Sequence, residues 1–97
     1  MKQYVVIAKD GTDANALAHR MQVRPHHLTG ASRLKANGNY VVGGATLNEA
    51  GQMDGSVMIV QFEDDAAFEQ WYQNEPYIKE GVWQTIEVKP FKVANVE

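Results

Sequence analysis

RPHHLTGASRLKANGNYVVGG, residues Arg24–Gly44, is the stretch around which the rest of this 97-residue chain is arranged. Pro25 suits the first turn of a helix, because its ring fixes φ and it lacks a backbone N–H. Apolar residues then recur at helical spacing, at Leu28, Ala31 and Leu34. Gly38 supplies a left-handed end to the helix, and residues 40–44 follow as a strand. The stretch therefore predicts a helix followed closely by a strand.

The segments on either side alternate between helix and strand patterns. Before Arg24 a helical stripe is formed by Ala14, Leu17, Ala18 and Met21. Pro25 is expected to break this helical connection into two pieces before Gly38. A later helix begins at Asp64–Asp65, where the helix dipole favours negative charge, and ends at Pro76. Runs rich in β-branched and aromatic residues predict strands at 3–8, 39–45, 55–62 and 83–89.

The resulting order, βαββαβ, is that of the ferredoxin-like α+β fold. It predicts a four-stranded antiparallel sheet with the helical segments on one face. The chain has no repeats or linkers, and residues 1–97 are expected to form a single domain.

The other face of the sheet is also apolar. In the first strand Tyr4 and Val6 point to one face while Val5 and Ile7 point to the other, and the strand at 55–62 alternates in the same way. Whichever set faces the helices, about four large apolar side chains remain uncovered, each worth roughly 1.5–3 kcal/mol on burial. A second copy across a two-fold axis is the simplest partner. We expect a homodimer through the helix-free sheet face; an unrelated protein partner is the alternative.

Composition excludes several classes of function. The chain has no cysteine, which rules out disulfides and thiolate metal sites, and its histidines lack zinc-motif spacing, so no metal is expected. No pattern for a flavin or nucleotide appears, so no cofactor is expected. A net charge of −3 and an aliphatic strand at 55–62 argue against nucleic acid. The start of the chain resembles neither a signal peptide nor a membrane span, and a cytoplasmic location with no membrane partner is expected.

His27 is the candidate catalytic residue. It lies on the helix that Pro25 is predicted to open, with Arg24 three residues earlier on the same side. A cation near the positive end of a helix favours an anionic neighbour, and it would keep His27 neutral, the form that a general base needs. The alternative is a half-buried structural histidine, with Arg24 paired to one of the chain's own carboxylates.

Four further residues are candidate substrate-binding groups. Gly44 could leave room for a small ligand beside the histidine, or could relieve crowding of the backbone. Ser56, at the start of a strand, could donate a hydrogen bond into the same pocket, although serine there is commonly a turn residue. Glu75 and Tyr77 flank Pro76 at the end of the later helix and could contribute a carboxylate and a phenol to a cleft. Arg24 is the expected anion anchor.

Six segments of the sequence together resemble the YciI-like, or YCII-related, family. They are RPHHL, the glycine-ended helix, the strand with two glycines, DGSVMIVQF, the EPY turn and GVWQTIEVKPFK. The resemblance runs from Tyr4 to Lys92. It implies a dimeric α+β barrel and an active site in a cleft, with a histidine that corresponds to His27 and an aspartate. At least one member acts as a dehydrochlorinase on a chlorinated hydroxyquinol. Together with the residues above, the resemblance favours a small cofactor-free enzyme in which His27 carries out acid–base chemistry, by proton transfer or elimination, on a small anionic or phenolic substrate.

The chain departs from this family pattern at the aspartate. Where the aspartate is expected, just before Gly38, the sequence has Ala36 and Asn37. A catalytic histidine is normally oriented by a carboxylate, so Glu75 or Asp54 would have to act from elsewhere. The turn also has EPY where family members often have DPY. The competing interpretation is a non-catalytic module that binds a small ligand or another protein after losing the catalytic pair.

Overall fold

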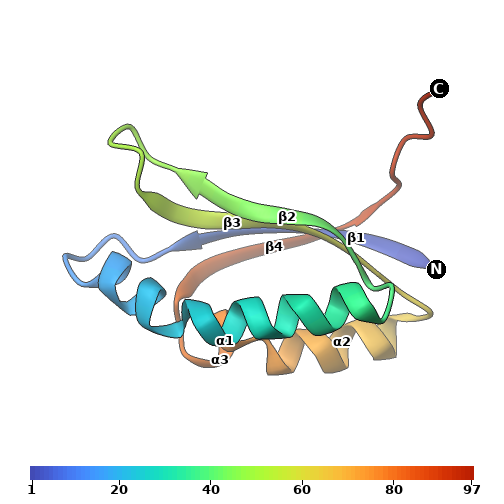
Figure 1. Ribbon diagram of the computed structural model, residues 1–97, viewed down its shortest axis with the longest axis horizontal. Coiled ribbons are helices and arrows are strands. Elements are labelled where there is room, and N and C mark those ends of the chain that lie inside the picture. The colour runs from blue at the N-terminus through green and yellow to red at the C-terminus, as the bar shows by residue number, and fades with distance from the viewer.

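The computed structural model describes all 97 residues and has one sheet and one layer of helices (Figure 1). Its elements, in chain order, are β1 Lys2–Asp10, α1 Ala16–Ala36, β2 Tyr40–Leu47, β3 Met53–Phe62, α2 Asp65–Asn74, α3 Pro76–Lys79 and β4 Trp83–Phe91. The predicted βαββαβ order is confirmed, with the short helix α3 added between α2 and β4. Pro76 ends α2 as expected, but it also begins α3, because proline is well suited to a first helical position.

All strand pairs are antiparallel, and the strand order is β2-β3-β1-β4. The three helices lie on the same side of the sheet (Figure 1). The fold is therefore the predicted ferredoxin-like α+β arrangement. None of the helices has both the length and the hydropathy of a membrane span.

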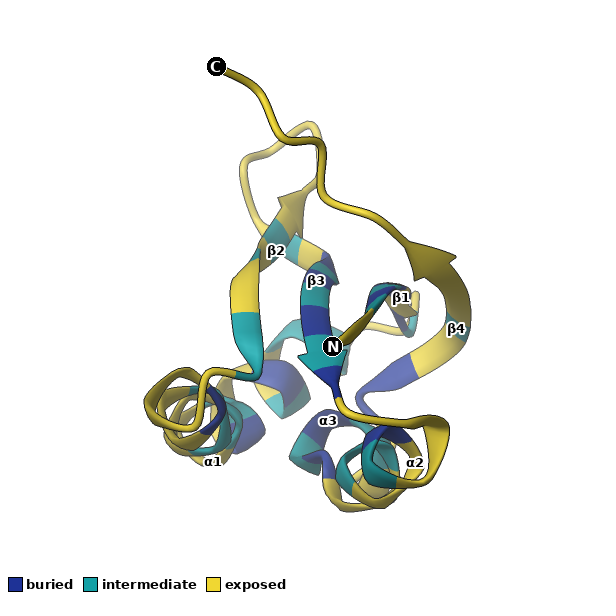
Figure 2. Ribbon diagram, turned by 90° about the vertical axis from the view of Figure 1, so that its right-hand side faces the viewer, coloured by how far each residue is buried: buried dark blue, intermediate teal, exposed yellow.

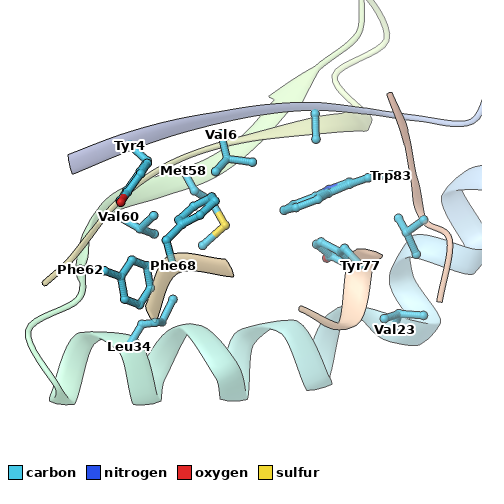
Figure 3. Close-up of a cluster of buried hydrophobic side chains, with 12 residues drawn as sticks. Tyr4, Val6, Val23, Leu34, Met58, Val60, Phe62, Phe68, Tyr77 and Trp83 are labelled. Atoms are coloured by element: carbon cyan, nitrogen blue, oxygen red, sulfur yellow. The ribbon is translucent and has the colours of Figure 1, made fainter. Parts of the chain in front are cut away.

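The hydrophobic core lies between the sheet and the helices (Figure 3). Register pairs Tyr4 with Val60 and Val6 with Met58, so that alternate side chains of the two central strands point to the helices. The Tyr4 ring stacks on Phe68 of α2 with ring centroids 4.2 Å apart. The buried apolar residues are Tyr4, Val6, Ala8, Val23, Leu34, Met58, Val60, Phe62, Phe68, Tyr77, Val82 and Trp83.

The helix-free face carries the opposite set of side chains, as the alternation predicted. Val5, Val57 and Ile59 on the central strands are only half-buried. Ile7 is 37% exposed, and Val42 on the edge strand β2 is 53% exposed. Figure 2 shows this side of the sheet without a helix over it. The protein therefore presents an apolar sheet surface to its surroundings.

Helix α1 is continuous through Pro25, so the predicted break there is wrong. Proline cannot donate to the carbonyl four residues earlier, which is that of Met21. Both Met21 and Pro25 are exposed, so water can hydrogen-bond this carbonyl. Burial of the opposite side of the helix offsets the cost of the proline, which is about 3 kcal/mol in a helix interior.

The buried side of α1 also differs from the expected stripe. Met21 and Leu28 are 47% and 45% exposed, while the inward positions hold Arg20, Val23 and Leu34. The predicted stripe is therefore right at Leu34, but it missed Arg20 and Val23, because a charged residue occupies part of the buried face. Gly38, at φ +76°, ends the helix region in the left-handed conformation that was predicted.

Candidate active site

His27 and Glu75, which are far apart in the sequence, meet between α1 and the junction of α2 with α3. The distance from His27 Nδ1 to Glu75 Oε1 is 2.6 Å. The His27 side chain is 12% exposed, and that of Glu75 is almost fully buried. A buried carboxylate within hydrogen-bond distance of an imidazole is the arrangement that orients a histidine for proton transfer.

The backbone of α3 indicates which way the hydrogen bond runs. Glu75 is the N-cap of α3, and its Oε1 also accepts a hydrogen bond from the backbone N–H of Tyr77 at 3.1 Å. An oxygen that accepts from an amide is acting as a carboxylate acceptor, so the natural donor on the imidazole is Nδ1–H. In a neutral imidazole held in this way, the lone pair is on Nε2.

Nε2 is the ring nitrogen that can meet a ligand. It makes no hydrogen bond within the protein. The buried polar side-chain atoms without a partner are Arg20 Nε and Tyr77 Oη, and Nε2 is not one of them. Because Nε2 has no partner in the protein and is not among these buried atoms, it keeps some contact with solvent, where the lone pair of a neutral ring can accept a proton.

Aromatic rings hold the imidazole in place. The Tyr77 ring lies nearly parallel to it at a centroid distance of 4.1 Å, and Trp83 meets it edge-on at 6.1 Å. Tyr77 belongs to α3 and Trp83 to β4 (Figure 3). Burial raises the pKa of the Tyr77 hydroxyl, and the positive charges of Arg20 and Arg24 oppose this rise. Tyr77 therefore remains a neutral phenol at neutral pH.

Arg24 lies one helical turn before His27 and is half-buried. None of the ion pairs or side-chain hydrogen bonds of the protein involves it, so the alternative in which it pairs with a carboxylate of the chain is not realised. The argument from the helix dipole was wrong, however, because α1 begins at Ala16 and Arg24 lies in its interior. Its free guanidinium remains available for an anion.

Ser56 belongs to a buried network that the sequence analysis did not find. Arg20 Nη1 contacts both carboxylate oxygens of Asp10 at 3.0 Å, and its Nη2 donates to Ser56 Oγ at 2.9 Å. Trp83 Nε1 also donates to Ser56 Oγ, at 3.2 Å. The only sequence signal was that Arg20 falls on the same helical face as Val23 and His27.

The remaining candidates lie elsewhere. Gly44 pairs with Val57 and therefore points to the helix-free face, on the other side of the sheet from His27. There it helps to line a hollow of about 260 Å³. Asn37 is at the end of α1, about 15 Å along the axis from His27, so a carboxylate at this position could not orient the ring. Asp54 is exposed and accepts a hydrogen bond from Thr46.

Among the two alternatives for the orienting carboxylate, the structure places Glu75 beside His27. Ser56, Glu75 and Tyr77 are all buried. Glu75 and Tyr77 contact the imidazole itself, whereas Ser56 contacts Trp83, which lies next to it. The structure contains no group of three or more histidine and carboxylate side chains that could hold a metal ion.

Comparison with known proteins places these residues in a family. The family model of the YCII-related domain matches residues 2–92. The chain belongs to the YCII-related family. It is 35% identical over 95 residues to protein YciI of Escherichia coli O6:H1 (strain CFT073), covering 92% of this chain and 95% of that protein. An uncharacterized protein of Haemophilus influenzae is also 35% identical, over 96 residues, with the same coverage.

Solved structures agree with the fold. This YCII-related chain is similar to the 5-chloro-2-hydroxyhydroquinone dehydrochlorinase of Burkholderia phenoliruptrix AC1100, solved in complex with 2,5-dihydroxybenzoquinone, at a TM-score of 0.79 and 26% identity over 95% of each chain. A dimeric ferredoxin-like protein of unknown function from Jannaschia sp. CCS1 shares the fold at a TM-score of 0.57 and 15% identity, covering 96% of this chain and all of that one.

Proposed function

We propose that this YCII-related protein is a cofactor-free acid–base enzyme in which His27 transfers a proton to or from a small anionic or phenolic substrate. The observation that carries the proposal is the 2.6 Å contact between His27 Nδ1 and a buried oxygen of Glu75. Glu75 holds the tautomer in which Nε2 has the lone pair, and it stabilises the imidazolium after proton transfer. Such proton transfer is typically worth a factor of about 10²–10⁴ in rate.

Arg24 is the proposed anion anchor. It lies one turn from His27 on the same helix, and it has no partner within the chain. A phenolate or carboxylate oxygen bound by its guanidinium would be presented to Nε2. Tyr77 and Ser56 are buried, so we assign them a supporting role behind the imidazole in place of direct contact with the substrate.

Elimination is the reaction class that fits these groups. One ring hydroxyl first ketonises, and its proton moves to the carbon that bears chlorine. A second hydroxyl proton then moves to Nε2, the electrons of that O–H bond form a second carbonyl and shift a ring double bond to the chlorinated carbon, and chloride leaves with its bonding electrons, so that HCl is lost and a quinone forms. The similarity to a dehydrochlorinase that binds a dihydroxybenzoquinone supports this class. The carboxylate that orients the base in this chain is glutamate.

We also propose that two copies pack through the helix-free face. Val5, Ile7, Val57 and Ile59 form an apolar surface there, and exposed Val42 extends it onto β2. Gly44 leaves a hollow in this surface into which a side chain of the second copy could fit. We place the protein in the cytoplasm, because a chain without cysteine gains nothing from an oxidising compartment.

The direct test is a substrate panel of chlorinated hydroxyquinols and lactones, assayed with the wild type and with His27→Gln. We expect chloride release or ring opening from at least one compound, slowed by about 100-fold or more in the variant. Equal rates in the two proteins would remove His27 from the chemistry. Ligands that bind without turnover across the whole panel would favour the non-catalytic module.

A further inference from the structure

The buried ion pair between Arg20 and Asp10 lies next to the aromatic rings that hold His27. The two side chains are only 3% and 2% exposed. Taking both charges out of water is costly, and a well-packed apolar pair of similar volume is often as stable. The pair is therefore a poor device for stability alone, and its contacts point to another role.

Those contacts connect Arg20 with the imidazole through Tyr77. The guanidinium carbon of Arg20 lies 4.8 Å from the centroid of the Tyr77 ring, which in turn stacks on His27 at 4.1 Å. A cation over an aromatic face is attracted by the ring quadrupole, most strongly where water is excluded. Arg20 therefore restrains the ring on which the imidazole lies.

Ser56 closes the network on the other side. Its hydroxyl accepts from both Arg20 Nη2 and Trp83 Nε1, and the Trp83 ring meets Tyr77 at 5.5 Å and His27 at 6.1 Å. Arg20 thus fixes one ring directly and a second ring through a serine. We call this set, Asp10, Arg20, Ser56 and Trp83, the Arg20 network.

We propose that Arg20 is a positioning residue for His27. Held by Asp10 and Ser56, it locks the Tyr77 and Trp83 rings so that Nδ1 of His27 stays on Glu75 and Nε2 stays open to solvent. This inference rests on the proposed function, since it concerns the orientation of the proposed base. This role needs the planar guanidinium of arginine. The ammonium group of a lysine could not at the same time pair with Asp10, donate a hydrogen bond to Ser56 and lie over the Tyr77 ring.

The test is the hydrogen-bonded Nδ1 proton of His27, followed by ¹H–¹⁵N NMR in the free protein, in the wild type and in Arg20→Lys. We expect a deshielded, slowly exchanging signal in the wild type that is absent from His27→Gln. In Arg20→Lys its exchange with water should be about fivefold faster or more, as expected when roughly one net hydrogen bond is lost. The ¹⁵N shifts should also show mixed tautomers.

A matched control separates positioning from stability. Leu34→Ala removes a core side chain of the same helix outside the Arg20 network, and it should lower stability while leaving the ¹⁵N tautomer shifts unchanged. If Arg20→Lys does not fold, the apolar exchange Asp10→Leu with Arg20→Met replaces it, with the same signal expected to change.

Unchanged exchange and tautomer shifts in a folded Arg20 variant would overturn the proposal. So would failure of both variants to fold, which would make the pair a purely structural element. The NMR signal is recorded without substrate. If the wild type showed no turnover, the proposed function would be refuted, but the effect of the Arg20 variants on the His27 signal could still be measured.

Discussion

His27 Nδ1 and Glu75 Oε1 lie 2.6 Å apart, although 48 positions separate the two residues in the chain. The contact joins the long helix α1 to the N-cap of the four-residue helix α3. The same oxygen accepts a backbone hydrogen bond from α3, so a single carboxylate both starts a helix and orients an imidazole. This makes the position of Glu75 rigid, which is what a base-orienting group requires.

Glu75→Gln should reduce turnover of the substrate by about 100-fold or more. Glutamine keeps an oxygen that can cap α3, so the fold is expected to persist, but it cannot stabilise an imidazolium. The measurement is kcat on the best compound of the panel. Asp54→Asn is the matched control, because Asp54 is an exposed carboxylate on β3, and its kcat should equal that of the wild type. A Glu75→Gln protein with unchanged kcat would show that the carboxylate has no catalytic role.

Arg24→Met should raise KM for an anionic substrate by about 10-fold or more, with a smaller effect on kcat. Hydrogen bonds to a charged group are worth roughly 1.5–3 kcal/mol, and methionine keeps the bulk of the side chain without its charge. The comparison is with Arg33→Met, a change of an exposed arginine in the last turn of the same helix. If both variants had the same KM as the wild type, Arg24 would not be the anion anchor.

Leu34→Ala and Leu28→Ala should differ sharply in their effect on stability. Leu34 is buried in the core, and its truncation is expected to lower the free energy of unfolding by about 2–5 kcal/mol. Leu28 is 45% exposed, so its truncation should cost within about 0.5 kcal/mol. Urea unfolding of both variants measures the difference. Equal losses would mean that α1 presents a different face to the sheet.

Raising the pH above about 10 should destabilise the protein, with Tyr4 as one cause. Burial, together with the hydrogen bond that its hydroxyl donates to Asp65, raises the pKa of Tyr4 from 10.0 to about 12. An unfolded tyrosine loses its proton near pH 10 while the folded one keeps it, so this contribution to stability is complete below about pH 10 and is lost towards about pH 12.

Tyr4→Phe should therefore make the stability of the fold decrease less steeply as the pH rises above about 10. The measurement is the urea midpoint as a function of pH in both proteins. The variant is expected to be less stable than the wild type at neutral pH, because the hydrogen bond to Asp65 is gone, and the two curves should converge at high pH. Parallel curves would show that the Tyr4 hydroxyl does not contribute to the pH dependence.

Sedimentation at micromolar concentration should give the mass of a dimer for the wild type and of a monomer for Ile59→Lys. A lysine in the middle of the helix-free face would have to be buried against the second copy without a partner. Gln70→Lys makes the same one-unit charge change on the exposed side of α2 and should remain dimeric. A wild type that sediments as a monomer would contradict the proposed interface.

Local sequence patterns predicted most of the fold. Alternation in β1 correctly separated Tyr4 and Val6 from Val5 and Ile7, because strand periodicity depends only on neighbouring residues. Pro25 misled the prediction, since the cost of a proline is local whereas the burial that offsets it comes from the sheet and α3. The predicted helix face was right at Leu34 but missed Arg20 for a related reason, because burial of Arg20 depends on a carboxylate from another element.

The site was less accessible to sequence reasoning. His27 and Arg24 were found because one helical turn places them together, and that relationship is local. The pairing with Glu75 depends on how α3 packs against α1, so the sequence left both Glu75 and Asp54 as candidates for this role. Nothing local in the sequence shows that the carboxylate of Asp10 is buried beside an arginine.

The most direct test of the paired His27 and Glu75 is the rate of the double variant His27→Gln with Glu75→Gln on the best compound of the panel. If the two residues act as one unit, the double variant should be about as slow as His27→Gln alone, because the carboxylate acts only through the imidazole. Rate losses that multiply in the double variant, or a His27→Gln protein as fast as the wild type, would contradict the pairing.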